Sequence, residues 1–133
     1  MRYILDTNIW IAILRRQTVP VRRLRQTLVD EDEIVMTPIE YFEVMRGLEL
    51  RGQRGPIEYL TALWLTLPYR DIDRETWEIA IRLWVKAVKE NRKREDADIL
   101  LAALATRHQA CLVTNNTGDF QYLGIELEDW TVE

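Results

Sequence analysis

Short apolar runs separated by stretches of helical periodicity constrain this fold more than any other feature. Residues 1–6, 33–37 and 111–114 each contain three consecutive apolar residues, which is typical of short buried strands. Strands that alternate with helices favour a parallel sheet, because the chain must cross over the sheet between neighbouring strands. The pattern predicts an α/β fold, a three-layer α/β/α sandwich with a mostly parallel central sheet.

Helical stretches fill the intervals between these strands. Helices are expected to begin near Asn8, after Pro20, at Thr37–Pro38 and at Pro56, and two more to span residues 74–91 and 97–108 behind the caps Asp73 and Asp96. Weaker strands are expected at 67–72 and, as an edge strand, at 125–127. In the helix over 74–91 the residues expected to face inward are Ala80, Leu83, Trp84, Ala87 and Val88.

Length and composition favour one domain over residues 1–133. The single cysteine, Cys111, excludes an internal disulfide and a cysteine zinc site, and its apolar neighbours favour a buried, inert thiol. The single histidine, His108, argues against chemistry that needs two imidazoles. No apolar run is long enough for a membrane span, and the first strand leaves no room for a signal peptide, so a cytoplasmic location is expected.

Acidic residues stand where strands end or helices begin. Asp6 closes the first strand, Glu43 lies about one and a half turns into the helix after the second, and Asp98 lies in the first turn of the helix before 111–114. The polar cluster 114–119 follows that last strand. Functional residues of parallel sheets gather at the carboxyl ends of the strands, and carboxylates that meet there form a site for a hard cation. The arrangement indicates metal-assisted phosphodiester chemistry.

Each acid also has a purely structural interpretation. Asp6 could cap the following helix, Glu43 could be an exposed helical residue, and Asp98 could interact with the helix dipole. Asp96 and Glu40 compete with Asp98 and Glu43 for the same roles, and Asp119 could be a turn residue after Gly118. The order of the acids and their expected position at one sheet edge favour function.

The net charge of −4 argues against a general nucleic-acid coat, so any positive surface must be local. Arg82, Lys86, Lys89 and Lys93 recur at helical spacing and would line one helix face. A solvated helix face is the simpler interpretation. Beside an acidic metal site, the same face could form the wall of a binding site for a polyanion such as RNA.

Four blocks, taken in this order, resemble the PIN-domain nucleases, and within them the VapC-type toxins of prokaryotic toxin–antitoxin pairs. The blocks are YILDTNIW at 3–10, EVMRG at 43–47, DILLAALA at 98–105, and LVTNN at 112–116 with DF at 119–120. The resemblance covers nearly the full chain. It implies an endoribonuclease that depends on Mg²⁺ or Mn²⁺.

The resemblance also implies roles for individual residues. Asp6, Glu43 and Asp98 match the family's metal-holding, catalytic acids, whereas the fourth acidic position of many members is Asn116 here. Relatives with asparagine at that position often keep an acid three residues later, which matches Asp119. Asn8 and Thr114, together with Asn116, match polar residues that hydrogen-bond around the acids.

The implied mechanism is in-line attack of an activated water on RNA, which leaves a 5′-phosphate and a 3′-hydroxyl. Asp6 and Asp98 would hold the metal, and Glu43 would bind it or accept the proton of the water. The implied partners are an RNA substrate, a cognate antitoxin and a second copy of the chain in a homodimer. Trp10, Ile13 and Trp64 could serve the antitoxin contact if they are exposed, although burial is the simpler expectation.

Three other functions compete with a toxin. A haloacid-dehalogenase-type phosphatase also has an aspartate after its first strand, but it needs a second acid where Asn8 stands. A catalytically silent PIN-like binding module would fit Asn116, but not the three retained acids. An RNA-processing PIN nuclease without an antitoxin remains open, as do the RNA target and the number of metals.

Overall fold

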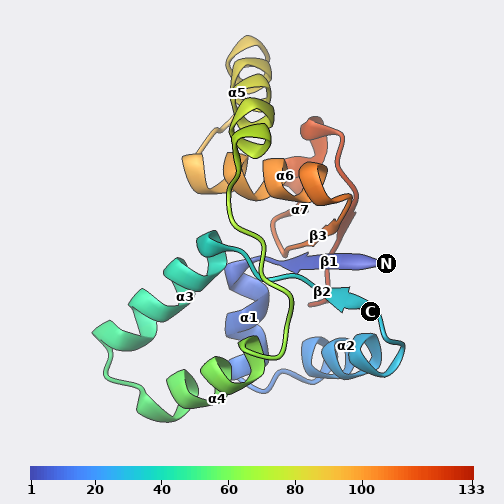
Figure 1. Ribbon diagram of the computed structural model, residues 1–133. Coiled ribbons are helices and arrows are strands. Elements are labelled where there is room, and N and C mark those ends of the chain that lie inside the picture. The colour runs from blue at the N-terminus through green and yellow to red at the C-terminus, as the bar shows by residue number, and fades with distance from the viewer.

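The computed structural model describes residues 1–133 and has alternating strands and helices (Figure 1). In chain order they are β1 (Arg2–Leu5), α1 (Thr7–Leu14), α2 (Thr18–Val29), β2 (Glu33–Ile34), α3 (Pro38–Leu50), α4 (Arg54–Trp64), α5 (Arg74–Lys89), α6 (Asp96–His108), β3 (Cys111–Val113), α7 (Thr117–Phe120), a 3₁₀ turn (Gln121–Leu123) and β4 (Leu127–Glu128). No helix is both long enough and apolar enough to cross a lipid bilayer.

The four strands form one fully parallel sheet in the order β2-β1-β3-β4. β1 pairs with β3 from Tyr3 opposite Cys111 to Leu5 opposite Val113, so the two central strands end side by side. The expected parallel sheet is therefore confirmed. Its carboxyl edge carries the residues that follow β1 and β3.

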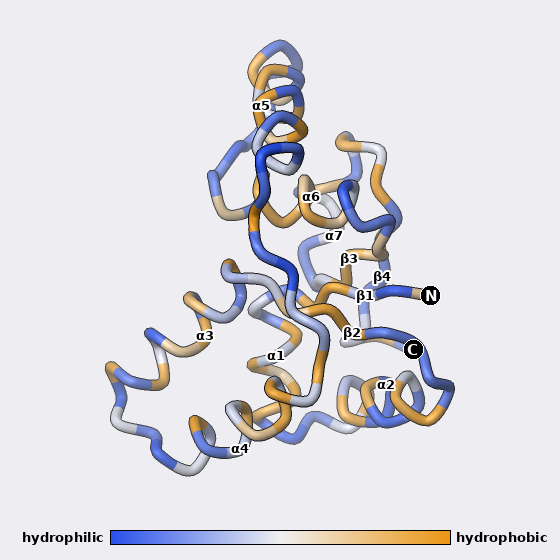
Figure 2. Tube along the Cα trace, viewed as in Figure 1, coloured by the Kyte–Doolittle hydropathy of each residue, from blue (hydrophilic) through white to orange (hydrophobic).

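Helices cover both faces of the sheet, which gives the expected three layers (Figure 1). Successive strand residues alternate between the layers because side chains of a strand point to opposite faces. Leu5 and Val113 pack with α1–α4, whereas Ile4 and Leu112 pack with α6. The two central strands are correspondingly apolar where both faces are covered, at Ile4 and Leu5 of β1 and from Cys111 to Val113 in β3, and Figure 2 shows β1 change from hydrophilic near the N-terminus to hydrophobic.

Helix α5 lies outside these layers and packs on α6 rather than on the sheet. Its inner face is formed by Ile79, Ala80 and Ala87, with Leu83 partly buried. The expectation that Trp84 and Val88 face inward is wrong, since they are 44% and 39% exposed. A single supporting helix buries only a narrow stripe, so the second apolar stripe of α5 remains on the surface.

Several local expectations need correction. Asp6, not Asn8, is the N-cap of α1, and Glu95, not Asp96, is the residue that precedes α6. The expected strand over 67–72 reduces to one bridge between Tyr69 and Met36. The edge strand lies slightly later than expected, at 127–128. Asp73 does cap α5, because its carboxylate accepts a hydrogen bond from the Thr76 amide.

Candidate active site

Asp6 and Thr114 stand at the carboxyl ends of the two central strands. Asp6 accepts a hydrogen bond from the Thr7 amide at 2.7 Å, so it caps α1. The Thr114 hydroxyl donates to the other carboxylate oxygen of Asp6 at 2.9 Å. Capping and a functional role are therefore compatible for Asp6, because each oxygen is used by a different neighbour.

Asparagine side chains extend this network across the sheet edge. Asn8 donates through Nδ2 to Asp6 Oδ2 at 3.2 Å, and its Oδ1 accepts from the Asn115 amide at 3.1 Å. The amide of Asn116 donates to the Thr114 hydroxyl at 3.1 Å. Asn8 and Thr114 thus lie directly against Asp6, whereas Asn116 reaches it only through Thr114.

Glu43 comes to the same site from α3. The hydroxyl of Thr7, the first residue of α1, donates to Glu43 Oε1 at 2.9 Å. Arg46, one turn further along α3, lies 4.0 Å from the other carboxylate oxygen of Glu43. Sequence reasoning missed Thr7, although its position between Asp6 and Asn8 was a signal.

Asp98, in the first turn of α6, completes the set. Asp6, Glu43 and Asp98 line one open pocket of about 430 Å³, together with Asn8, Asn115 and Asn116. The three acids therefore meet as the order of the strands predicted. Neither Asp6 nor Asp98 forms an ion pair with a basic side chain.

Burial and mutual repulsion raise the pKa values of two acids in this pocket, Asp6 and Asp98. Burial raises the pKa of Asp6, and the charge of Glu43 raises it further, while hydrogen bonds from Thr114 and Thr7 oppose the shift. Burial, and then the charge of Asp6, raises the pKa of Asp98 to about 6. Repulsion of this kind is relieved when a cation binds.

The donors in the pocket fit a hard divalent cation. They are carboxylate and amide oxygens, with no cysteine or histidine among the lining residues. The acids are not drawn into a tight cage: the only three ligand-type side chains with atoms within 4.8 Å of one another are Cys111, Glu126 and Glu128, outside this pocket. A widely spaced oxygen set suits Mg²⁺, which keeps several of its waters.

The Cys111 side chain lacks a reactive thiolate. Burial, and then the charges of Glu128 and Glu126, raises the pKa of the Cys111 thiol to about 12. Because the thiolate is the reactive form of cysteine, a thiol with this pKa is unreactive near neutral pH. The expectation of a buried Cys111 is confirmed.

Comparison with known proteins places this geometry in a family. The PIN domain profile matches residues 3–125, which include β2, β3, all of β1 except Arg2, and all three pocket acids. The chain belongs to the PIN domain family.

Relatives of this PIN domain cover its whole length. The protein named Ribonuclease VapC1 from Haemophilus influenzae strain R2866 is 26% identical over 135 residues, which is 98% of this chain and 99% of the relative. A chain in the VapBC-1 structure from nontypeable Haemophilus influenzae has a TM-score of 0.82 at 26% identity, with coverage of 99% and 100%. Rickettsia felis VapBC2, bound to a DNA fragment from its promoter, gives a TM-score of 0.87 at 23% identity, with coverage of 98% and 99%.

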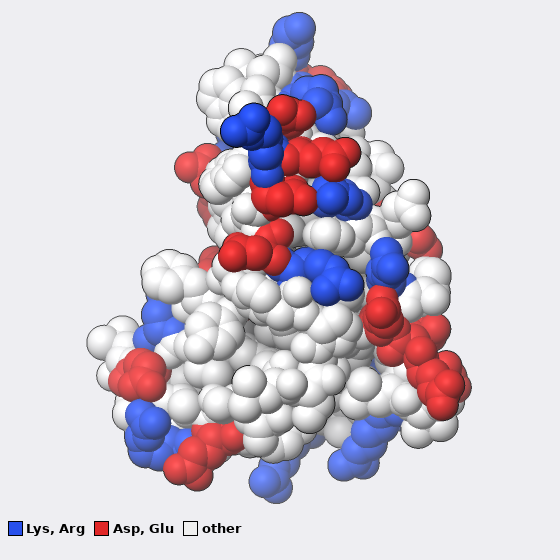
Figure 3. All heavy atoms as spheres, viewed as in Figure 1, with Lys and Arg blue, Asp and Glu red and all other residues white.

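Some of the residues that the sequence predicted to lie around the PIN domain acids do not line the pocket. Asp119, in α7, contributes to the raised pKa of Asp98 but does not line the pocket. Lys93 Nζ lies 3.8 Å from the Asp119 carboxylate. Arg82, Lys86 and Lys89 are exposed on α5 and form no ion pair with an acid of the pocket. Figure 3 shows basic and acidic side chains intermingled over α5. Direct RNA contact by this face remains a prediction.

The competition between Glu40 and Glu43 is resolved by burial. Glu40 is fully buried and forms a capping box with Thr37, whose amide and hydroxyl both donate to it. Burial raises the pKa of Glu40 to about 8. Glu43 is the one that lines the pocket. Glu40 therefore acts in the fold, as the anchor of the α3 N-terminus.

Proposed function

We propose that this PIN domain is a metal-dependent endoribonuclease that acts as the toxin of a toxin–antitoxin pair. The observation that carries the proposal is the convergence of Asp6, Glu43 and Asp98 from three separate segments into one pocket that has carboxylate oxygens but no cysteine or histidine. Such a group of acids destabilises the metal-free protein through mutual repulsion, which a bound cation would relieve. The relative named Ribonuclease VapC1 covers the same length, which supports RNA as the substrate.

In the proposed reaction, Asp6 and Asp98 hold a divalent cation, Mg²⁺ or Mn²⁺, and Asp119 remains a candidate for an additional ligand. A divalent cation held there would supply the charge that activates a water and that offsets negative charge on the phosphodiester. Thr114 and Asn8 fix the Asp6 carboxylate in place through their hydrogen bonds. These hydrogen bonds hold the Asp6 carboxylate in the orientation needed for metal binding before the ion binds.

Glu43 is suited to accept the proton of the attacking water. Thr7 occupies one of its oxygens, and the side chain is only partly buried at the pocket wall. The oxygen of the water forms a bond to phosphorus as the bond from phosphorus to the 3′-oxygen breaks. The products are a 5′-phosphate and a 3′-hydroxyl, with the proton of the water passing to Glu43 and then to the leaving oxygen or to solvent.

The deciding experiment is RNA cleavage by the purified chain with Mn²⁺, with Mg²⁺ and with EDTA. Asp6→Asn is expected to lower the cleavage rate at least 100-fold, because it removes a metal ligand while keeping the shape of the N-cap. Asp96→Asn is the control, since Asp96 lies in the same helical turn as Asp98 but outside the pocket. Metal binding without cleavage of any RNA would favour a silent binding module instead.

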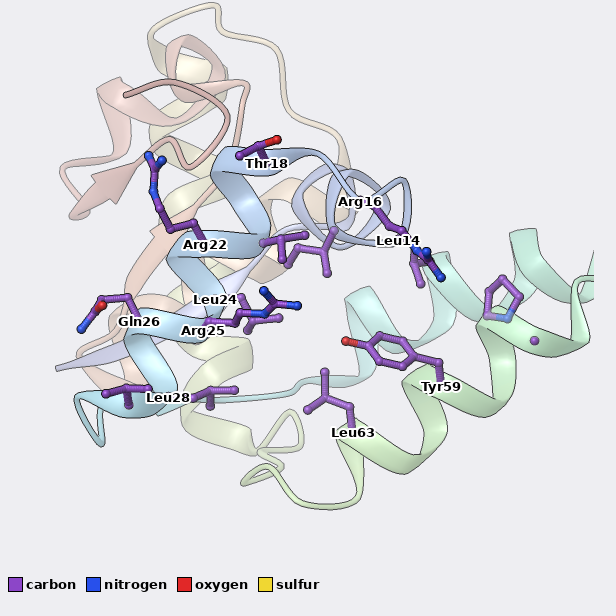
Figure 4. Close-up of a pocket in the computed structure, with 15 residues that line it drawn as sticks. Leu14, Arg16, Thr18, Arg22, Leu24, Arg25, Gln26, Leu28, Tyr59 and Leu63 are labelled. Atoms are coloured by element: carbon purple, nitrogen blue, oxygen red, sulfur yellow. The ribbon is translucent and has the colours of Figure 1, made fainter.

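A groove of about 1080 Å³ between α2 and α4 is the proposed antitoxin site. Leu24 and Leu28 from α2 face Tyr59 and Leu63 from α4 across it (Figure 4). Trp10 and Trp64, which sequence reasoning offered for this contact, are buried, and Ile13 reaches the groove only as part of its floor. An apolar groove of this shape accepts an amphipathic helix of a partner.

The charges at the groove define the partner further. Arg16, Arg22 and Arg25 line it, and no acidic residue does. The proposed partner helix therefore carries acidic residues beside its apolar face. The similar solved structures include VapBC-1 from nontypeable Haemophilus influenzae and VapBC-5 from Mycobacterium tuberculosis, a member of the VapBC family of toxin–antitoxin systems, which supports an antitoxin as this partner.

A pair of exposed leucines tests the groove. Leu28→Asp places a negative charge in the groove and is expected to weaken binding of the product of the adjacent small reading frame at least tenfold. Leu65→Asp, at a leucine that is 82% exposed and lies outside the groove, should bind normally. No binding by the unaltered chain would favour a PIN nuclease without an antitoxin.

The exposed stripe on α5 is the proposed homodimer contact. It consists of Trp77, Ile81, Trp84, Val85 and Val88, spaced so that they share one face of the helix. Acidic residues flank its start and basic residues its end, so an antiparallel pairing of two copies brings opposite charges together. Ile81→Glu should yield monomers in sedimentation, whereas Leu50→Glu, on exposed α3 surface, should not.

A further inference from the structure

One basic side chain, that of Arg15, lines the pocket that holds the three acids. Arg15 is exposed, and it takes part in none of the ion pairs of the protein. A guanidinium that shares a pocket with three carboxylates but pairs with none of them is free to bind the anionic group of a ligand.

The backbone explains how Arg15 reaches the pocket. Arg15 ends α1 as its C-cap, and the next residue, Arg16, adopts a left-handed conformation with φ of 57°. This turn sends two consecutive arginines to different places: Arg15 lines the acidic pocket, and Arg16 lines the groove between α2 and α4. Gln17 lines the acidic pocket again. The position of Arg15 is thus set by the fold rather than by a flexible loop.

Arg15 does not serve as the counter-ion of the acids. No ion pair joins Arg15 to Asp6, Glu43 or Asp98, and the groups that contact the Asp6 carboxylate are hydrogen-bond donors of Thr7, Asn8 and Thr114. The neutral side chains that share the wall with Arg15 include Gln17, Asn115 and Asn116. This side of the pocket therefore has one positively charged side chain and several amide groups that can donate hydrogen bonds.

We propose that Arg15 is a substrate-binding residue that holds an RNA phosphate adjacent to the scissile phosphodiester. This inference rests on the proposed ribonuclease function. The planar guanidinium matches two oxygens of a phosphate group, whereas the scissile phosphate itself lies among the carboxylates and their metal. Amides of Gln17, Asn115 and Asn116 then face the sugar and bases of the neighbouring nucleotides.

Binding of a short single-stranded RNA over a series of salt concentrations tests this role. Asp6→Asn is the background, so that the RNA is not cleaved during the measurement. Arg15→Ala is expected to weaken binding about tenfold at low salt and to reduce the salt slope by about 0.7, the value for one lost phosphate contact on a single strand. Arg15→Lys should keep the salt slope but lose part of the affinity for RNA, because lysine keeps the positive charge but not the planar guanidinium that can bind two phosphate oxygens at once.

The matched control is Arg51→Ala. Arg51 is an exposed C-cap like Arg15, at the end of α3, but it lines neither pocket. Its removal should leave the salt slope unchanged. In the catalytically intact protein, Arg15→Ala should raise KM about tenfold with a smaller effect on kcat, and should leave Mn²⁺ binding unchanged.

Three results would overturn the assignment, and they are distinguishable. If the unaltered chain cleaves RNA with Mn²⁺ and Arg15→Ala behaves like Arg51→Ala, the role of Arg15 fails while the ribonuclease function stands. If Arg15→Ala tightens Mn²⁺ binding and leaves the salt slope unchanged, Arg15 is a counter-ion of the acids. If the unaltered chain cleaves no RNA with either metal, the proposed function fails and the assignment of Arg15 fails with it.

Discussion

The Thr114 hydroxyl donates a hydrogen bond of 2.9 Å to the Asp6 carboxylate across 108 residues of sequence. Both residues are nearly inaccessible to solvent, so this bond joins the ends of β1 and β3 at the point where the acids meet. A buried bond to a charged acceptor contributes to stability and also fixes the orientation of the carboxylate. Stability and metal binding are therefore linked at this pair.

Replacement of Thr114 by valine keeps the volume and removes the donor. The expected cost is about 1–3 kcal/mol in the free energy of unfolding, because a buried carboxylate loses a partner. The affinity for Mn²⁺ should fall about tenfold, since Asp6 is no longer held in position. Thr27→Val is the control: Thr27 is also buried and bonded through its hydroxyl, to Arg23 O, but it lies away from the pocket. Equal metal affinity in both variants would contradict the positioning role.

Metal affinity should depend on pH through Asp98. Its pKa is raised to about 6, mainly by burial and then by the charge of Asp6, so below pH 6 a proton occupies a group that the metal needs. The affinity for Mn²⁺ is expected to rise up to tenfold per pH unit between pH 5 and 6 and to level off above pH 7. Titration calorimetry in two buffers with different ionisation enthalpies should detect a released proton at pH 5.5. In Asp98→Asn this proton release should disappear.

Stability should depend on pH through Glu40. Its folded-state pKa of about 8 lies above the value of 4.5 for the free side chain, so the folded protein binds this proton more tightly than the unfolded chain does. The stability that Glu40 contributes is full below pH 4.5, and it is lost as pH rises toward 8, at up to about 1.4 kcal/mol per unit. Glu40→Gln keeps a neutral partner for Thr37 and should flatten this slope. Urea unfolding at several pH values measures it; an unchanged slope would show that Glu40 is ionised in the folded protein.

The meeting of Asp6 and Thr114 could be predicted from the sequence because it depends only on where parallel strands end. Asp6 and Thr114 follow the two central strands directly, so any parallel pairing of β1 and β3 brings them together. The link from Thr7 to Glu43 could not be predicted, since it depends on how α3 packs against α1. The position of Arg15 depends likewise on one left-handed residue after α1, which no periodicity reveals.

The apolar pattern of α5 shows a second limit of sequence reasoning. Trp84 and Val88 have the spacing of a buried face, but α6 covers only the neighbouring stripe with Ile79, Ala80 and Ala87. When a helix carries two apolar stripes, the sequence alone does not show which of them packs against a neighbouring helix and which is exposed. The expectation that Trp10 and Trp64 are buried is confirmed, since their rings pack edge to face at 5.4 Å inside the core.

The order of stability between two asparagine variants should reverse when metal is added. In EDTA at pH 7.5, Asp98→Asn is expected to be more stable than the unaltered chain by about 1 kcal/mol, after a discount for solvent screening of this half-exposed acid. Asp96→Asn, in the same turn but outside the pocket, should change little and serves as the control. At Mn²⁺ concentrations about 100 times Kd, the unaltered chain and Asp96→Asn should gain about 2.7 kcal/mol and Asp98→Asn much less. Urea unfolding under both conditions measures the reversal. If Asp98→Asn gained as much from Mn²⁺ as the control, Asp98 would not be a metal ligand.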